Sequence, residues 1–474
     1  MSAFKSVFIA CCLILLLQAA SAFRTHSKHL DLVHGGKQST FNGQFIDHFN
    51  PLDGRTWAQR YWVDNTFYSP GSNSPIFLYI CGESTCKGTP STGSYVYQMA
   101  QKTGALLVAL EHRYYGLSQP FGPQSMKTEN LRYLTVENAL EDLAYFILWF
   151  KDNYTYKITE SQPWITVGGS YPGALSAWFR NKYPHMTVGA WASSGVVNSI
   201  LDYTEYDYQI YLSVAKSGEA CPQTIQNLTQ YFEYQLYNTS TDVAQALKAK
   251  FGDNAVKLSN DEMLWFIADS FVSFVQYGKQ VELCSFLTNF TDFDSLVKAA
   301  IPYLAASNDV RGYGTYFISN DTFDADMEDK IIRQWTYQVC AQLGWFQTYS
   351  NKTPYMMRSK RINLDFFRTY CKNAYGVALW PNTDRFNNDF GGADLRTTNV
   401  ILSNGGEDPW RWATKYTTTG SMTSIIIDCV GCGHCVDFHG ANSTDPQELQ
   451  QAHAQIQGLL LGYLGRSQTE SITL

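Results

Sequence analysis

The sequence predicts an α/β protein whose parallel sheet is interrupted by a long, mostly helical insertion. Before residue 200, short runs rich in β-branched and aromatic residues alternate with helical patterns, as in βαβ units. These runs are SPIFLYICGES, GALLVALEHRYYG, PWITVGGS and TVGAWASSGVV. Strand signals then become rare until TTNVILSNGGEDPW and SIIIDCVGCGH. Since the chain has 474 residues, we expect either one enlarged domain or two domains.

The organisation predicted along the chain begins with a secretory signal peptide over residues 1–22. Lys5 precedes an apolar run that ends at Leu17, and small residues at positions 20–22 provide a cleavage site. Residues 23–40 are polar and are a candidate pro-segment. The remaining expected parts are the first part of the α/β domain at 41–199, the helical insertion at 200–385, and the second part of the α/β domain at 386–474.

Helical periodicity marks two of the helices that flank the sheet. In TVENALEDLAYFILWF, apolar residues at positions 140, 143, 144 and 147 form one face, with Thr135 as the predicted N-cap. A final helix is predicted to begin with a capping box formed by Asp445 and Glu448, and Pro446 takes its first helical position.

Composition excludes several classes of partner. Only 16% of residues are charged and 15% are aromatic, which is typical of a well-buried globular enzyme rather than a disordered chain. The net charge of -7 and the pI near 5.7 argue against nucleic acid or an anionic membrane as partner. After the signal peptide, no apolar run is long enough to span a bilayer.

Sequons and cysteines indicate the secretory route. Together with the signal peptide, seven N-x-S/T sequons favour a glycoprotein located in a lysosome or vacuole or outside the cell. The predicted glycosylation sites are Asn153, Asn227, Asn238, Asn289, Asn320, Asn351 and Asn442. Two of the eleven cysteines lie in the signal peptide, so nine remain. In an oxidising compartment most should pair, and the odd number leaves at least one free or intermolecular thiol.

A glycine-flanked serine is the candidate nucleophile. In VGGSYPGALSAWFRNKYP (167–184), Ser170 follows the strand PWITV and precedes a helix. This strand, turn and helix lift a serine hydroxyl above the sheet and place the N–H of Tyr171 at a helix N-terminus, where it can bind an oxyanion. The G-x-S-x-G pattern has glycine where this chain has Pro172. Because proline removes only its own N–H, we expect it to be tolerated. The alternative is a Gly-Gly turn carrying a solvent-exposed serine.

The predicted base is a histidine near the carboxyl end. In α/β-hydrolases the catalytic residues follow the order Ser, Asp or Glu, His, each on a loop after a strand. His453 lies on the final helix among apolar neighbours, and His439 lies six residues beyond the Gly-Cys-Gly turn. His434 occupies that turn and is therefore the predicted base.

The predicted carboxylate partner is Asp408, which ends the loop after NVILSNG. Glu407 beside it should point elsewhere, and Asp428 lies within the following strand. A base of this kind requires such a carboxylate to orient it.

Three cysteines surround the predicted base at metal-like spacing: Cys429, Cys432 and Cys435. A zinc site usually needs four ligands in two separated pairs, and an oxidising compartment favours disulfides. We therefore predict a disulfide or thiol that holds the histidine loop, with no metal and no cofactor.

Several long blocks resemble one family of serine peptidases. They are DHFNPLDGRTWAQRYW, LEHRYYGLSQPFG, GGSYPGALSAWFRNKYP with ASSGVV, RQWTYQVCAQLGWFQT, RFNNDFGGADLRTTNVILSNGGEDPW and GHCVDF. The chain resembles, from about residue 40 to 465, the family of lysosomal Pro-X carboxypeptidase, dipeptidyl peptidase II and thymus-specific serine protease. GHCVDF looks most like the thymus-specific branch.

The resemblance implies an α/β-hydrolase fold with an inserted helical cap, and exopeptidase action after proline or a small P1 residue. It places the family's nucleophile, acid and base on Ser170, Asp408 and His434, the residues already chosen from chain order. It also implies a disulfide between Cys340 and Cys371. The departures from the family pattern are Pro172, the CGES sequence in the loop expected to supply the second oxyanion donor from Glu83, and Arg411 after Asp-Pro-Trp.

The predicted function is that of a serine exopeptidase acting on short peptides. Trp335, Tyr337 and Trp345 are candidates for the P1 wall, although each is equally plausible as ordinary core. Glu83 is a candidate for binding a terminal amine and Arg411 for a terminal carboxylate, and the sequence leaves both open. The alternatives are an esterase or lipase of the same fold, for which no long apolar lid helix is evident, and a non-catalytic binding protein. A homodimer is a further possibility.

Overall fold

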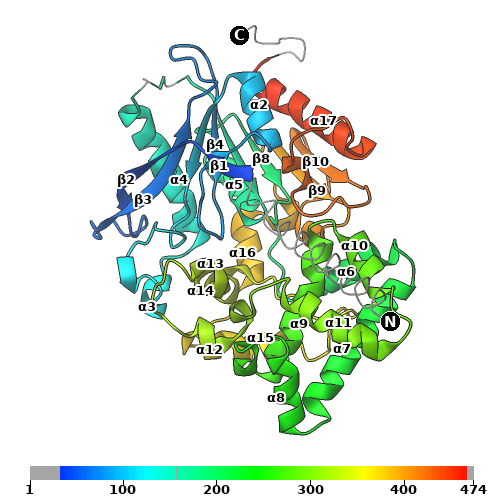
Figure 1. The fold of residues 1–474 in the computed structure, drawn as a ribbon. Helices are drawn as coiled ribbons and strands as arrows, with labels where there is room; N and C mark the ends of the chain where they lie inside the picture. Colours follow the sequence, from blue (N-terminus) through cyan, green and yellow to red (C-terminus); the bar gives the residue numbers. More distant parts are fainter. Residues whose placement is uncertain (1–31, 156–157, 160, 467–474) are drawn as a thin grey trace, which may run out of the picture.

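An eight-stranded mixed sheet forms the centre of the computed structural model, which describes residues 32–155, 158–159 and 161–466 (Figure 1). Its strands lie in the order β10-β9-β8-β7-β4-β6-β3-β2. They are β2 (Lys37–Phe45), β3 (Thr56–Asp64), β4 (Ile76–Ile80), β6 (Leu106–Leu110), β7 (Trp164–Gly169), β8 (Gly189–Ser193), β9 (Val400–Gly405) and β10 (Met422–Ile427). All neighbouring pairs from β10 to β6 are parallel, whereas β3 runs antiparallel to both β6 and β2. The predicted α/β class is confirmed.

The amino-terminal strands begin inside the range predicted as a polar segment. A small second sheet pairs β1 (Val33–Gly35) with β5 (Thr89–Pro90), and β2 then starts at Lys37. The described part of the predicted segment is therefore folded onto the domain. The predicted signal peptide and residues 23–31 lie outside the described residues.

The sheet is buried on both faces, because alternate side chains of its parallel strands enter different clusters. Phe77, Leu107 and Ile165 pack with α2 (Tyr95–Thr103) and α17 (Gln447–Tyr463). The intervening residues of these strands pack with α4 (Val136–Asn153) and α5 (Tyr171–Lys182). Alternation with period two places successive side chains of a strand on opposite faces, so helices cover both sides.

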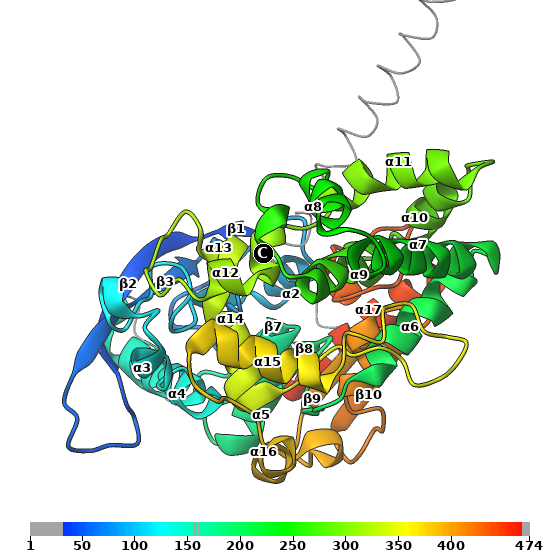
Figure 2. The same ribbon diagram turned by 90° about the horizontal axis from the view of Figure 1, so that it is seen from below.

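The helical insertion connects β8 to β9. Its helices are α6 (Thr204–Ala215), α7 (Ala220–Tyr237), α8 (Thr241–Ala249), α9 (Asn260–Gln276), α10 (Gln280–Leu287), α11 (Phe293–Ala305), α12 (Thr315–Ile318), α13 (Glu328–Ile331), α14 (Arg333–Gln338), α15 (Leu364–Tyr375) and α16 (Thr383–Phe390). A short α3 (Thr128–Leu131) precedes α4. Figure 2, viewed from the insertion side, shows α9, α14 and α15 around the ends of β7, β8 and β9. The insertion therefore covers the sheet edge at which Ser170 follows β7.

The two predicted helix starts have different outcomes. Thr135 caps α4, since its side chain accepts a hydrogen bond from the N–H of Asn138. The capping box predicted for α17 is wrong: the helix begins at Gln447, and Pro446 is its N-cap without a side-chain hydrogen bond. The Asp445 carboxylate instead accepts the N–H of Asn442 at 2.8 Å.

Four disulfides join eight of the described cysteines: Cys81–Cys86, Cys221–Cys284, Cys340–Cys371 and Cys429–Cys432. Cys435 is a buried free thiol. All seven sequon asparagines are exposed, as a carbohydrate attached there would require. Over the described ranges, no helix combines the length and the apolar character that crossing a membrane requires.

Candidate active site

Ser170 occupies a strained turn between β7 and α5. Its φ of 65° and ψ of -132° are unusual for a residue other than glycine. Its N–H donates to the carbonyl of Ser193 at 2.8 Å, which ties the turn to the neighbouring strand β8. Backbone strain of this kind persists only where surrounding structure enforces it, and it occurs frequently at functional sites. The turn exposes the Ser170 side chain to a cavity and places Tyr171 in the first turn of α5.

Glycines allow α5 to approach the sheet despite Pro172. A Cβ at Gly168 would lie 2.2 Å from the Pro172 carbonyl oxygen, and a Cβ at Gly173 would lie 2.7 Å from that of Ser193. The Pro172 ring instead lies against the preceding loop, where a Cβ at Gly82 would be 2.2 Å from its Cγ. Close strand–helix packing thus depends on Gly168 and Gly173, and Gly82 makes room for the proline.

Asp408 and His434 form a buried pair. Nδ1 of His434 lies 2.8 Å from Oδ2 of Asp408, and both side chains are buried. Oδ1 of Asp408 accepts the N–H of Trp410 at 2.9 Å, and the N–H of His434 donates to the carbonyl of Gln276 at 2.7 Å. Burial opposes the charged imidazole, but Asp408 and Cys435 outweigh it and raise the His434 pKa well above 6.5. The arrangement orients the imidazole and stabilises its protonated form.

The alternative acids lie elsewhere. The Glu407 carboxylate points away from His434, pairing with Lys216 at 3.1 Å and accepting the N–H of Gly431 at 3.0 Å. The Asp428 side chain is 71% exposed. Asp408, which we chose from chain order and strand position, is therefore the carboxylate that contacts His434.

The alternative histidine on the final helix is packed as the sequence indicated. His453 is buried on α17 against Tyr95, with ring centroids 3.9 Å apart. Its Nε2 lies 3.1 Å from the carbonyl of Asp437. His439 pairs through its backbone with Ser94 in an isolated β-bridge.

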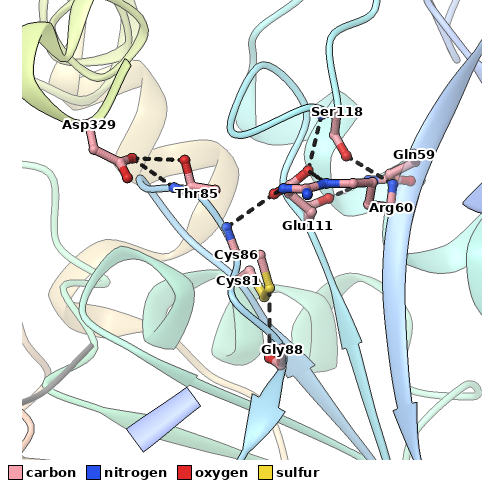
Figure 3. Close-up of a disulfide and its surroundings, with 9 residues drawn as sticks. All are labelled: Gln59, Arg60, Cys81, Thr85, Cys86, Gly88, Glu111, Ser118 and Asp329. Atoms are coloured by element: carbon pink, nitrogen blue, oxygen red, sulfur yellow. Dashed lines mark hydrogen bonds and ion pairs between the residues drawn. A yellow bond between two sulfur atoms is a disulfide. The ribbon is translucent and has the colours of Figure 1, made fainter. Parts of the chain in front are cut away.

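The loop carrying Glu83 is closed by the Cys81–Cys86 disulfide (Figure 3). On the sheet side, the N–H of Cys86 donates to Oε1 of Glu111 at 3.1 Å. On the insertion side, the N–H of Thr85 donates to Oδ1 of Asp329 in α13 at 2.8 Å. Glu111 is itself fixed, because Nε of Arg60 donates to its Oε2 at 2.8 Å. These anchors hold a short loop rigidly beside Ser170.

Glu83 itself faces the serine. Burial raises the pKa of the Glu83 carboxyl, and the Ser170 hydroxyl hydrogen-bonds to it. Both residues line one cavity with Tyr171. The predicted oxyanion loop, the helix N-terminus and the serine thus converge at one point.

The cavity has a volume of about 310 Å³ and lies between the α/β domain and the insertion. Aromatic rings form one wall of the cavity. The ring centroid of Trp335 lies 5.6 Å from that of Tyr171 and 6.3 Å from that of Trp345. The ring centroids of Trp345 and Trp410 are 6.1 Å apart. Two of the three aromatic residues predicted for the P1 wall, Trp335 and Trp345, therefore line it. Tyr337 does not, because it packs against Tyr375 at 5.3 Å.

Arg411, the predicted binder of a terminal carboxylate, also lies outside the cavity lining. Its Nη1 donates to the carbonyl of Gly406 at 2.6 Å, and its Nε donates to the hydroxyl of Tyr416 at 3.2 Å. The guanidinium therefore hydrogen-bonds to the backbone of the loop that carries Asp408.

One face of α9 lines the cavity and was missed from the sequence. It presents Trp265, Asp269, Val272, Ser273 and Gln276. These positions follow helical spacing in NDEMLWFIADSFVSFVQ, where Asp269 interrupts an apolar run. An acidic residue on the apolar face of a predicted helix was the signal that could have identified it.

Comparison with known proteins identifies the family. The family model described as Serine carboxypeptidase S28 matches residues 44–456. The chain belongs to the serine carboxypeptidase S28 family. It is 38% identical over 411 residues to "Probable serine protease EDA2" of Arabidopsis thaliana, covering 84% of this chain and 80% of that protein.

Two human relatives match a similar share of the chain at lower identity. The chain is 28% identical to lysosomal Pro-X carboxypeptidase of Homo sapiens, covering 87% of this chain and 85% of that protein. It is 27% identical to thymus-specific serine protease of Homo sapiens, covering 87% of this chain and 84% of that protein. These identities confirm the predicted family without separating its branches. The S28 chain is a serine-type peptidase, which decides against the esterase and binding-protein alternatives.

Proposed function

We propose that this S28 peptidase is an exopeptidase that cleaves short peptides after proline or a small residue, using Ser170, His434 and Asp408. The observation that carries the proposal is the buried Asp408–His434 pair, at 2.8 Å, in a serine peptidase whose strained Ser170 turn lines the cavity. A nucleophilic serine requires a base, and the base requires an orienting carboxylate.

In the proposed reaction, Oγ of Ser170 attacks the P1 carbonyl carbon and its proton passes to Nε2 of His434. Asp408 holds the histidine in the tautomer that can accept this proton. The N–H groups of Tyr171 and Glu83 donate to the oxyanion of the tetrahedral intermediate. His434 then protonates the leaving amine, and water hydrolyses the acyl-enzyme.

The aromatic wall supports the proposed P1 preference. Flat rings at Trp335 and Trp345 can pack a pyrrolidine ring while leaving little room for long side chains. The insertion also limits access, so short peptides should enter and folded proteins should not. The preference agrees with the name of the human relative, lysosomal Pro-X carboxypeptidase.

The proposed cellular route is secretory. Exposure of all seven sequon asparagines and four disulfides support passage through an oxidising compartment. A lysosomal or vacuolar site, or release from the cell, remains the expectation. Glycosylation and a homodimer stay predictions.

Mass spectrometry of three peptide sets tests the proposal. One set has proline second from the amino end, one has it second from the carboxyl end, and one has it only internally. We expect efficient cleavage of one terminal set, loss on replacing proline by leucine, and no turnover by Ser170→Ala. Efficient cleavage of the internal set, or indifference to leucine, would overturn the exopeptidase assignment.

A further inference from the structure

A chain of hydrogen bonds joins Tyr171 to the insertion. The hydroxyl of Tyr115 donates to Oε1 of Gln338 at 2.6 Å. Nε2 of Gln338 in turn donates to the hydroxyl oxygen of Tyr171 at 2.9 Å. That oxygen also lies 3.0 Å from Nε2 of His112, whose Nδ1 lies 2.7 Å from the carbonyl oxygen of Arg113. The chain therefore connects the loop after β6, the insertion helix α14 and the first residue of α5.

The chemistry of the groups fixes the direction of each bond in this chain. A carbonyl oxygen only accepts, so Nδ1 of His112 carries a proton. Burial lowers the pKa of His112 to about 4, so at pH values well above 4 the ring is neutral and its Nε2 is an acceptor. The Tyr171 hydroxyl therefore donates to His112 and accepts from Gln338. Bonds aligned in one direction polarise and strengthen one another.

The chain is shielded from solvent and, apart from Tyr171, from the cavity. Tyr171 and Gln338 are fully buried, and Tyr115 and His112 are buried beside them. A buried hydroxyl or amide that loses its partner carries a desolvation penalty, so the members of the chain hold one another in place. Of these four described residues, only Tyr171 lines the cavity. Any effect of Gln338 on the reaction must therefore pass through another residue.

Tyr171 needs such a restraint because its backbone is held weakly by the helix itself. It is the first residue of α5, and the first N–H groups of a helix have no acceptor within the helix. Pro172 follows it, and the residue before a proline is disfavoured in the helical region. The side chain is therefore the part of Tyr171 through which the surrounding structure can fix its N–H, the proposed oxyanion donor.

Helix α14 contacts the Tyr171 side chain at two points. The ring centroid of Trp335 lies 5.6 Å from that of Tyr171, and Gln338 binds the hydroxyl. Trp335 and Gln338 are three residues apart, a spacing that places both on one face of a helix. His112 holds the same hydroxyl from the α/β domain. The Tyr171 side chain is thus fixed between the insertion and the sheet.

We propose that Gln338 is a positioning residue, which holds the N–H of Tyr171 in the orientation that the oxyanion requires. The inference rests on the proposed function and gives the insertion a part in stabilising the transition state, in addition to covering the cavity. Gln338 neither gives nor takes a proton in the reaction. Because the oxyanion exists only in the tetrahedral intermediate, the contribution of Gln338 should appear in kcat rather than in KM.

The test begins with Gln338→Met, assayed on the best-cleaved peptide of the three sets. Methionine is close to glutamine in length and removes the N–H that Tyr171 accepts. We expect kcat to fall about 10- to 100-fold with KM nearly unchanged, because a misplaced oxyanion donor should cost less than a deleted one, for which the loss is roughly 10²–10³. The inhibition constant of a peptide boronate, which forms a tetrahedral adduct with the serine, should rise by the same factor.

The matched control is Gln342→Met, in the π-helical turn that follows α14. Gln342 also bridges the insertion to the α/β domain, but it binds α4: it accepts the N–H of Val136 at 2.9 Å and donates to Oε2 of Glu137 at 2.7 Å. Gln342→Met should keep kcat near the wild-type value. An equal loss of kcat in this variant would show that Gln338 only docks the insertion and would overturn the inference.

Tyr171→Phe decides the question even if Gln338→Met fails to fold. It removes one hydroxyl and should lower kcat by at least the same factor, and the double variant should be no slower than the slower single variant, because both changes break one hydrogen bond. Thermal unfolding and titration of the reactive serine by a fluorophosphonate correct each rate for the folded fraction. Unchanged kcat in either folded single variant, a rise in KM at constant kcat, or losses that multiply in the double variant would contradict the inference. Cleavage and serine labelling by wild-type protein test the proposed function separately, and if wild-type protein shows neither, both proposals fail.

Discussion

Gly82→Ala should disable the oxyanion loop through Pro172. A Cβ at position 82 would lie 2.2 Å from Cγ of Pro172, and ordinary van der Waals contact begins at 3.4 Å. The loop must therefore move by about 1.2 Å, because a proline ring in a helix N-terminus cannot turn aside. The same loop carries Glu83, whose N–H is the proposed second oxyanion donor. A displacement of about 1 Å in an active site costs roughly 100-fold in rate, so kcat/KM should fall by about that factor.

The assay is kcat/KM on an X-Pro coumarylamide, with thermal unfolding as the control for folding. Pro172→Gly alone should keep kcat/KM within about tenfold and lower stability by about 1 kcal/mol, largely through unfolded-state entropy. The double variant Gly82→Ala with Pro172→Gly should recover most of the lost activity, because the clashing ring is gone. Full activity in Gly82→Ala, or no recovery in the double variant of a folded protein, would refute the reasoning.

Three further outcomes are expected. Asp408→Asn should lower kcat on the order of 10⁴-fold in steady-state assays, because the histidine is then held in the wrong tautomer; a loss under tenfold would contradict this. The His434 pKa is raised well above 6.5, and the base acts only when neutral, so fluorophosphonate labelling should decline with acidification already above pH 6.5; a flat rate down to pH 6 would disagree. Replacing Cys340 and Cys371 together by alanine opens a loop of 31 residues and should lower the unfolding free energy by about 3–4 kcal/mol in denaturant titrations; a change below about 1 kcal/mol would show that the bond adds little.

The end of the sheet that carries Ser170, Asp408 and His434 was predictable because local patterns determine it. A strand, a glycine turn and an amphipathic helix around Ser170 specify the turn without reference to distant residues. Strand ends also located Asp408 and His434, since carboxyl ends of parallel strands meet at one edge. The strand β2 was not anticipated: its first four residues are exposed, so it shows no run of apolar residues.

The walls of the cavity were harder to predict because they depend on tertiary packing. Trp335 and Tyr337 are two residues apart on one short helix, so they point in different directions, and only Trp335 reaches the cavity. Arg411 is engaged by a carbonyl that no sequence pattern reveals. The carboxylate of Asp269 pairs with Arg358, which lies 89 positions further along the chain, and only the folded chain brings the two side chains together.

The most direct test of the account is to identify the serine that a fluorophosphonate modifies in folded protein. Tryptic mass spectrometry should find one adduct, on the peptide that contains Ser170, and none in Ser170→Ala. The adduct should form far more slowly in Asp408→Asn, because the base is then misoriented. A folded protein that stays unlabelled, or carries its adduct on another serine such as Ser194 while Ser170 is unmodified, would contradict the central claim.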